Sequence, residues 1–331
     1  MSHPSGSPSS LSSAALWIER ENACAIRSGE LAAPRNGEVL VRNEYSGISR
    51  GTEATVLQGR VPASEYARMR GPNMEGDFPF PVKYGYASVG TVESGPDDIK
   101  GRKVFCLHPH QDRFVVGAEQ VHPLPSELPP ERAVLAANME TALNIVWDAN
   151  IQPGDKVAVF GAGVVGSLVA NISSRIAGTD TVIVDNNPRR RRHVEALGLS
   201  FAEPNDLGGE FDILINASAS PEALTTAISC AAFEAKIVEA SWYGDRNATI
   251  PLGGAFHSRR LSIVSSQVGS VPADRSHRWS FRRRMSKALE LLLDPRLDNL
   301  ISGETKFTDL PEDYPRILND QDTLCHRVYY P

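Results

Sequence analysis

A glycine-rich turn between an apolar strand and an apolar helix constrains the fold of this 331-residue chain more than any other feature. The segment KVAVFGAGVVGSLVA places three glycines directly after a run that predicts a buried strand. In such a turn Gly161 permits the tight bend, Gly163 lets the backbone approach a pyrophosphate, and Gly166 allows close packing of helix on strand. The following helix, with Val165 in its first turn, presents free N–H groups to phosphates. The segment therefore predicts a dinucleotide-binding turn, although a packing-driven glycine turn is the simpler alternative.

A carboxylate follows the next predicted strand. Asp185 ends the segment TVIVD, roughly 20 residues beyond Gly166, where a carboxylate accepts hydrogen bonds from the adenosine ribose. The sequence therefore predicts NAD as the cofactor, because this carboxylate repels the 2′-phosphate of NADP. NADP is the second choice, since one of the guanidiniums of Arg189 to Arg192 can neutralise such a phosphate. A solvated helix start is the simpler interpretation of those arginines.

The alternation of strands and helices changes along the chain. Up to about residue 135, short alternating strands such as EVLVRNEYSGIS and ASVGTVES are separated by Gly/Pro turns, which indicates a mainly β domain. From Asp155 strands alternate with helices, which predicts an α/β domain with a Rossmann doubly wound parallel sheet. We expect a disordered lead-in at 1–15, a first domain at 16–135 plus 301–331, and the Rossmann domain at 136–300.

Composition limits the classes of partner. The net charge of −6 argues against nucleic acid or an anionic membrane surface as a partner, and no apolar run approaches the ~20 residues that span a bilayer. The Ser/Pro-rich N-terminus predicts a disordered segment rather than a signal peptide. Four scattered cysteines without a Cys-x-x-Cys pair indicate reduced thiols and exclude a four-cysteine zinc site. We therefore expect a cytoplasmic protein with a small-molecule substrate.

The order of these segments resembles the medium-chain dehydrogenase/reductase superfamily, the alcohol and sorbitol dehydrogenase relatives, over nearly the whole chain. GEVLVRNEYSGIS is similar to the strand before its first zinc ligand, and GAGVVG to its cofactor turn. The resemblance implies a GroES-like irregular β-barrel as the first domain and a homodimer that pairs through the Rossmann edge strand. In FDILINASASPEAL it places Ala217 and Ser218 close to the cofactor. In LSIVSSQVGS it implies that the backbone of Val268 and Gly269 holds the nicotinamide carboxamide.

Two motifs resemble one branch of that superfamily more specifically. SGISRGTE and YGYASVG are similar to segments of the bacteriochlorophyllide a dehydrogenase branch, which oxidises a hydroxyethyl side chain on a tetrapyrrole. The likeness is confined to these motifs and does not carry that substrate to this chain.

The same motifs depart from the zinc-bearing members. Ser49 stands where those members have a zinc-ligating Cys, and Tyr86-Ala87 stands where they have His-Glu. Neutral serine and tyrosine oxygens are poor zinc ligands, so the resemblance predicts a member without zinc. Glu140, in ANMETAL, is the one surviving acidic candidate. A relocated metal is the alternative, because Cys106-x-His108-x-His110 would place three ligands on one side of a predicted strand.

Without a metal, a side chain must manage the proton and the charge on the substrate oxygen. Tyr86 is the first candidate because it stands at the former ligand position, with space filling as the alternative. A phenol with a reference pKa near ~10 donates readily but is a poor base unless a cation such as Lys83 or Arg50 lowers that pKa. Glu140, Ser49 and His108 are the further catalytic candidates, each with a structural alternative.

Two further features are predicted from the resemblance and from charge. Glu53 resembles a supporting acid of the family that pairs with an arginine such as Arg50. The basic and aromatic segment HRWSFRRR, residues 277–284, contacts an anionic group or forms a solvated helix face.

These observations predict a zinc-independent oxidoreductase that transfers a hydride between NAD(H) and a CH–OH/C=O substrate. Two alternatives stay open. The first is a reductase of an activated C=C, as in zinc-free quinone and enoyl reductases. The second is a dinucleotide-binding protein that has lost its catalytic chemistry.

Overall fold

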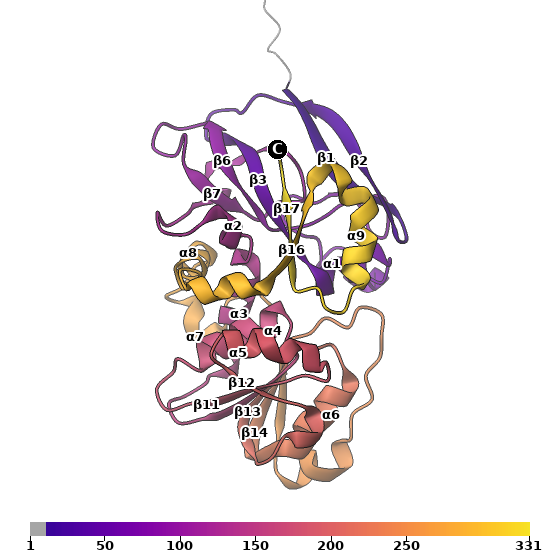
Figure 1. Cartoon of the computed structure of the whole chain (residues 1–331), viewed down its shortest axis with the longest axis vertical. Coiled ribbons are helices and arrows are strands. Elements are labelled where there is room, and N and C mark those ends of the chain that lie inside the picture. Colours follow the sequence, from indigo (N-terminus) through magenta and orange to yellow (C-terminus); the bar gives the residue numbers. More distant parts are fainter. Residues whose placement is uncertain (1–10) are drawn as a thin grey trace, which may run out of the picture. The chain divides into compact units, whose positions relative to one another are not determined.

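The computed structural model describes residues 11–331, which divide by contacts into two units (Figure 1). The first unit contains the chain up to Val134 together with Gly303–Asp320 and His326–Pro331. The second unit contains Leu135–Ser302 and Gln321–Cys325. Each unit has its own sheets and its own buried core, so we describe each by itself.

The second unit is built on a parallel sheet of six strands within the described residues, in the order β12-β11-β10-β13-β14-β15. The order reverses between β10 and β13, so the carboxyl ends of these two neighbours form the switch point of a Rossmann doubly wound sheet. The strands are β10 (Lys156–Phe160), β11 (Asp180–Val184), β12 (Ser200–Ala202), β13 (Phe211–Asn216), β14 (Ala231–Glu239) and β15 (Ser262–Ser265).

Helices cover this sheet because its central strands are apolar almost throughout. In β10 and β13 nearly every residue is buried, which is typical of parallel strands packed on both faces. Helix α4 packs on β10 and β11, α6 on β13 and β14, and α3 on α4, α8 and β14. The helices are α3 (Ala136–Ala149), α4 (Val164–Ser173), α5 (Arg191–Ala196), α6 (Pro221–Cys230), α7 (Ala273–Ser276) and α8 (Phe281–Leu291).

The first unit is mainly β and contains two antiparallel sheets. The smaller has the order β2-β1-β5-β4, and the larger, seven strands within residues 11–331, runs β16-β17-β3-β6-β7-β9 with β8 paired to β3. The strands are β1 (Leu11–Arg20), β2 (Ala23–Leu31), β3 (Glu38–Ser49), β4 (Glu75–Gly76), β5 (Val82–Lys83), β6 (Ser88–Ser94), β7 (Lys103–Cys106), β8 (Arg113–Gly117), β9 (Val121–Pro123), β16 (Ile301–Lys306) and β17 (Cys325–Tyr329). Helices α1 (Arg50–Leu57), α2 (Pro130–Ala133) and α9 (Leu310–Asn319) complete the unit.

Alternating side chains form the core of the larger sheet. Val39 and Val41 of β3 lie with Val92 of β6, Val104 of β7 and Phe114 of β8 in one buried cluster. Because side chains alternate across a strand, these positions share one face. Strand β17 returns from the C-terminal end of the chain to pair in the sheet that contains β3, and this fixes the direction of the last residues.

Two local expectations differ from the structure. Residues 11–15, expected in the disordered lead-in, form the start of β1 and pair with β2, whereas residues 1–10 lie outside the described part. Strand β7 ends at Cys106, so His108 and His110 lie in the following loop rather than on the strand. Among residues 11–331 no helix is long and apolar enough to span a membrane.

Candidate functional site

The glycine turn of the second unit lies at the switch point, between β10 and α4. Gly161 has a φ of +105°, which an L side chain rarely adopts. A Cβ on Gly166 would lie 1.9 Å from the carbonyl oxygen of Gly161, so residue 166 must lack a side chain. A Cβ on Gly163 would have nothing within 4 Å, which leaves open space beside the start of α4. Gly163 precedes α4 without a side-chain cap, so the first N–H groups there are available to an anionic ligand.

Asp185 stabilises this turn directly. The backbone N–H of Ala162 donates to Oδ2 of Asp185 at 2.7 Å, and the N–H of Asn187 donates to Oδ1 at 2.8 Å. The carboxylate therefore lies at the carboxyl end of β11, beside the glycine turn. These residues fit a dinucleotide: a glycine turn, an uncapped helix start and a carboxylate for the ribose.

The four arginines after Asp185 are largely engaged within the second unit. Arg189 pairs with Asp322 at 2.7 Å, and the buried Arg190 donates to the carbonyl oxygens of Gln321 and Thr323. Arg191 lies over the ring of Phe201. Residues 188–193, Glu195 and Asp322 line a surface pocket here. The arginines thus mainly hold the 321–323 segment and α5.

A polar cluster lies after β13 and β14. Its members Asn216, Glu239 and Tyr243 were not among the residues predicted from the sequence. Ser218 donates to Oδ1 of Asn216 at 2.6 Å, and Asn216 donates to Glu239 at 2.7 Å. Tyr243 donates to the same carboxylate at 3.2 Å. Burial, and secondly Glu239, raises the pKa of Tyr243 to about 12. These strand-end positions meet at the edge where ligands bind in doubly wound sheets, and that topological rule was the available signal for finding them.

The segment after β15 contains Val268 and Gly269 and is held along its length by α3. Ser266 donates to Asp148 at 2.6 Å, and Asn144 donates to Asp148 at 2.9 Å. Glu140, Asn144 and Asp148 are spaced by four residues, so they share one face of the helix. The N–H of Gly269 donates to Oε1 of Gln267 at 2.6 Å.

Glu140 belongs to the second unit and is bound to Arg284 of α8. Both side chains are almost fully buried, and Nε of Arg284 donates to Oε1 of Glu140 at 3.0 Å. Burial raises the pKa of Glu140, and Arg284 opposes that rise. The residues of the segment 277–284 have different environments. Ser280 caps α8 by accepting from the N–H of Arg283, whereas the side chain of Arg284 is buried in the interior. No local sequence pattern marks this pair.

A buried network in the first unit surrounds Glu53. Its Oε2 accepts from Tyr314 at 2.6 Å and lies 3.0 Å from Nε2 of His110, and its Oε1 accepts from the N–H of Ser49 at 2.7 Å. The hydroxyl of Ser46 lies 2.7 Å from Nδ1 of His110 and 2.9 Å from the hydroxyl of Tyr330. Glu53 and His110 are fully buried. Glu53 was predicted to pair with an arginine such as Arg50. In the structure its carboxylate is bound by Tyr314, His110 and the N–H of Ser49.

Ser49 and Tyr86 lie at the ends of neighbouring strands of this unit. Ser49 is the last residue of β3, and Tyr86 lies two residues before β6, which pairs with β3. The half-buried ring of Tyr86 meets Tyr84 edge-on at 6.1 Å between centroids. Lys83, suggested as a cation near Tyr86, is buried and donates to Glu75 and Gln111.

His108 is also placed in the first unit, where it is packed as a neutral ring. It stacks on Phe114 with 3.8 Å between centroids, and Nδ1 lies 3.0 Å from the carbonyl oxygen of Pro109. Burial, and secondly Lys83, lowers the pKa of His108 to about 3. A ring that stays neutral through the physiological range is favoured as a packing group rather than as a proton carrier.

The buried His108 predicts a specific pH dependence of stability. The pKa of His108 in the folded state, about 3, lies below the unfolded value of about 6.5, so the unfolded state binds the proton first. Stability should therefore fall as the pH falls from about 7 to 5, by about 2 kcal/mol from this residue alone. Urea unfolding of wild type and His108→Phe at both pH values measures the difference. An equal loss in both proteins would contradict the expectation.

Among residues 11–331 no group of three or more His, Cys, Asp or Glu side chains is arranged to hold a metal ion. The relocated site at Cys106, His108 and His110 is likewise not formed. Burial raises the pKa of the Cys106 thiol to about 12, and the two histidines make the contacts described above.

Comparison with known proteins gives the class of the chain. No family model matches. A D-guloside 3-dehydrogenase of Escherichia coli is 25% identical over 312 residues, covering 84% of this chain and 88% of the relative. A 2-desacetyl-2-hydroxyethyl bacteriochlorophyllide A dehydrogenase of Cereibacter sphaeroides is 27% identical over 321 residues, covering 90% and 92%. A (R,R)-butanediol dehydrogenase of Bacillus subtilis is 29% identical over 259 residues, covering 65% and 73%.

Solved structures share the fold. The L-idonate 5-dehydrogenase of Escherichia coli superposes with a TM-score of 0.80 at 15% identity, covering 97% of this chain and 99% of its own. A putative zinc-binding dehydrogenase of Clostridium scindens superposes with a TM-score of 0.76 at 15% identity, covering 96% of this chain and 99% of its own. These similarities support an enzyme of the dehydrogenase or reductase kind.

Structure neighbours of this enzyme contain nicotinamide cofactors. An Escherichia coli alcohol dehydrogenase with a TM-score of 0.76 and 17% identity, covering 96% of this chain and 98% of its own, was solved with NADH. A putative zinc-binding dehydrogenase of Sinorhizobium meliloti, with the same TM-score and identity and coverage of 96% and 99%, was solved with NADP. The expected fold, Rossmann plus GroES-like, is confirmed by the solved structures.

Proposed function

We propose that this enzyme transfers a hydride between NAD(H) and a CH–OH/C=O substrate without a catalytic zinc. The glycine turn is the observation that carries the proposal, because Gly163 leaves open space where the backbone meets a pyrophosphate. The similarity to a D-guloside dehydrogenase and a butanediol dehydrogenase favours the CH–OH/C=O pair over an activated C=C. The small-molecule substrate and the homodimer stay predictions.

NAD is the proposed cofactor over NADP. The Asp185 carboxylate is fixed beside the turn by two backbone N–H groups, and a carboxylate there repels a 2′-phosphate. Arg189 and Arg190, the cations nearest in sequence, are committed to the 321–323 segment. Comparing kcat/KM with NAD(H) and NADP(H) tests this choice, and a preference for the phosphorylated cofactor would overturn it.

The bound nicotinamide would supply or accept the hydride, and the chain must bind it and manage the substrate proton. The start of α4 and Asp185 would hold the pyrophosphate and the ribose. Tyr86 is the proposed proton donor, because a phenol hydroxyl can donate to an alkoxide as it forms. This assignment favours reduction of a carbonyl. Ser49 would support the proton transfer, while Glu140, bound to Arg284, is left out of it.

Turnover of the purified enzyme with panels of alcohols, ketones and enones tests the function. Nicotinamide absorbance should change with alcohols or ketones and survive removal of zinc by a chelator. Cofactor use with enones alone would move the assignment to a C=C reductase. Loss of turnover with zinc removed, and its return on adding zinc, would overturn zinc independence.

Tyr86→Phe tests the proton donor. We expect kcat to fall by about 10²- to 10⁴-fold, because general acid catalysis by the hydroxyl is lost, while the Kd for NADH stays unchanged. Steady-state kinetics and NADH fluorescence titration measure the two quantities. Tyr66→Phe, at the far end of the same row of aromatic rings, is the matched control and should keep full activity. Equal activity of both variants would assign Tyr86 to space filling.

A further inference from the structure

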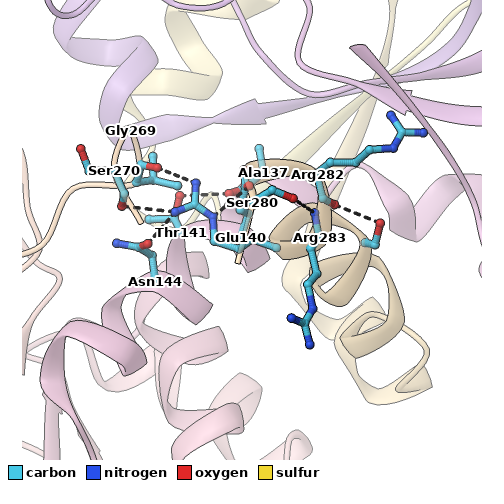
Figure 2. Close-up of polar contacts among 12 residues, drawn as sticks. Ala137, Glu140, Thr141, Asn144, Gly269, Ser270, Ser280, Arg282 and Arg283 are labelled. Carbon is cyan, nitrogen blue, oxygen red and sulfur yellow. Dashed lines mark hydrogen bonds and ion pairs between the residues drawn. The ribbon is translucent and has the colours of Figure 1, made fainter. Parts of the chain in front are cut away.

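The turn Gln267–Ser270, which follows β15, is fixed from its buried side by one guanidinium. Nη2 of Arg284 donates to the carbonyl oxygen of Val268 at 2.6 Å, and Nη1 lies 3.3 Å from that of Ser270. Nη1 also donates to Oδ1 of Asn144 at 2.5 Å. Figure 2 shows the labelled residues Glu140, Asn144 and Ser270 close to one another. Arg284 therefore holds two backbone carbonyls of the turn against helix α3.

Only an arginine meets all of these acceptors together. Its planar fork offers donors in several directions at once, whereas a lysine ammonium is a compact point charge. The side chain of Arg284 is 2% exposed, so its charge requires a partner in the interior, and Glu140 provides it. Because Glu140 compensates this buried charge, the Arg284 guanidinium can lie in the interior within hydrogen-bonding distance of the turn.

The contacts determine which groups of the turn face outward. In a trans peptide the C=O and N–H point in opposite directions. Because the carbonyl of Val268 points to the buried Arg284, the N–H of Gly269 points away from it. That N–H is bonded to the side chain of Gln267, and both residues are exposed. A side-chain amide at an exposed position is an acceptor that a ligand can replace.

We propose that Arg284 is a positioning residue for the nicotinamide end of the cofactor. It fixes the Val268–Ser270 backbone so that the N–H of Gly269 is presented to the nicotinamide carboxamide, which displaces the Gln267 side chain. Glu140 balances the charge of Arg284, and Asn144 orients the planar guanidinium of Arg284. The inference rests on the proposed nicotinamide cofactor and adds the residues that shape its binding segment.

Binding of two ligands to Arg284→Lys tests this role. NADH and ADP-ribose share the adenosine, the pyrophosphate and the second ribose, but ADP-ribose lacks the nicotinamide. Arg284→Lys keeps a charge opposite Glu140 and loses the fork. The Kd for NADH should rise roughly tenfold, as expected for the loss of one or two hydrogen bonds, while the Kd for ADP-ribose stays within about twofold. Isothermal titration calorimetry measures both.

Two further variants keep the result interpretable. Asn144→Ala removes one acceptor of the fork and leaves the ion pair, so it should raise the NADH Kd by a smaller factor and leave ADP-ribose binding unchanged. Arg282→Lys, on the exposed side of α8, is the control and should bind both ligands as wild type does. Equal losses for NADH and ADP-ribose, or no loss for either, would overturn the positioning role. Wild-type protein that binds neither ligand would overturn the proposed function itself.

Discussion

Replacing Gly166 with alanine is expected to weaken cofactor binding strongly and to destabilise the second unit. The new Cβ would lie 1.9 Å from the carbonyl oxygen of Gly161, so either the turn or the start of α4 must move. Overpacking of this kind costs about 1–3 kcal/mol. We expect the Kd for NADH to rise by roughly 100-fold or more, equivalent to about 2.7 kcal/mol. Fluorescence titration and thermal unfolding measure the two effects.

Gly163→Ala separates stability from binding at the same turn. A Cβ there meets nothing within 4 Å, so the unliganded protein should keep its stability. NADH affinity should still fall, because the methyl group occupies space that the pyrophosphate needs. Gly208→Ala, also in the second unit and also without close neighbours, is the control and should match wild type in both assays. Normal NADH binding by both Gly163→Ala and Gly166→Ala would contradict the cofactor role of the turn.

Replacing Glu53 with alanine is expected to give the largest loss of stability in the first unit. Its carboxylate is fully buried and lies within hydrogen-bonding distance of Tyr314, His110 and the N–H of Ser49. Removing one member of a buried, charge-assisted network leaves the others unsatisfied, which costs about 3–5 kcal/mol. Urea unfolding measures the change in free energy.

Tyr314→Phe provides the graded comparison for Glu53→Ala. It removes one donor to the carboxylate and keeps the ring, so it should cost about 1–2 kcal/mol. A cost below 1 kcal/mol for Glu53→Ala would show that the network contributes little to the fold. A similar cost for the two variants would show that the Tyr314 bond carries most of the contribution.

The cofactor half of the candidate site could be predicted because its signals are local. The glycines at 161, 163 and 166 lie in one short segment between a strand and a helix, and Asp185 ends the next strand, so spacing alone indicated them. The positions of Val268 and Gly269 came from the resemblance to a family. Arg284 and Asn144, which hold that segment, lie on two helices that are far apart in the sequence. No sequence motif contains both residues, so their contact could not be predicted.

The polar residues of the first unit show the limit of sequence spacing. Cys106, His108 and His110 alternate in the sequence, but β7 ends at Cys106, so the alternation does not place them on one face. His108 instead stacks on Phe114, and His110 joins Glu53. Residues at i, i+2 and i+4 share one face only if the strand continues through all of them. Here a loop begins at Leu107, so the spacing does not predict where the two histidines lie.

The sequence by itself determined the order of strands and helices, the parallel sheet and the glycine turn, because these depend on periodicity and on residues that are neighbours in the chain. Only the tertiary structure decided the partners of the buried charges. Glu140 meets Arg284 across 144 positions of the chain, and Tyr314 meets Glu53 across 261. A buried charge takes whichever partner the packing brings within hydrogen-bond distance, and that proximity is set by the folded chain rather than by any local pattern.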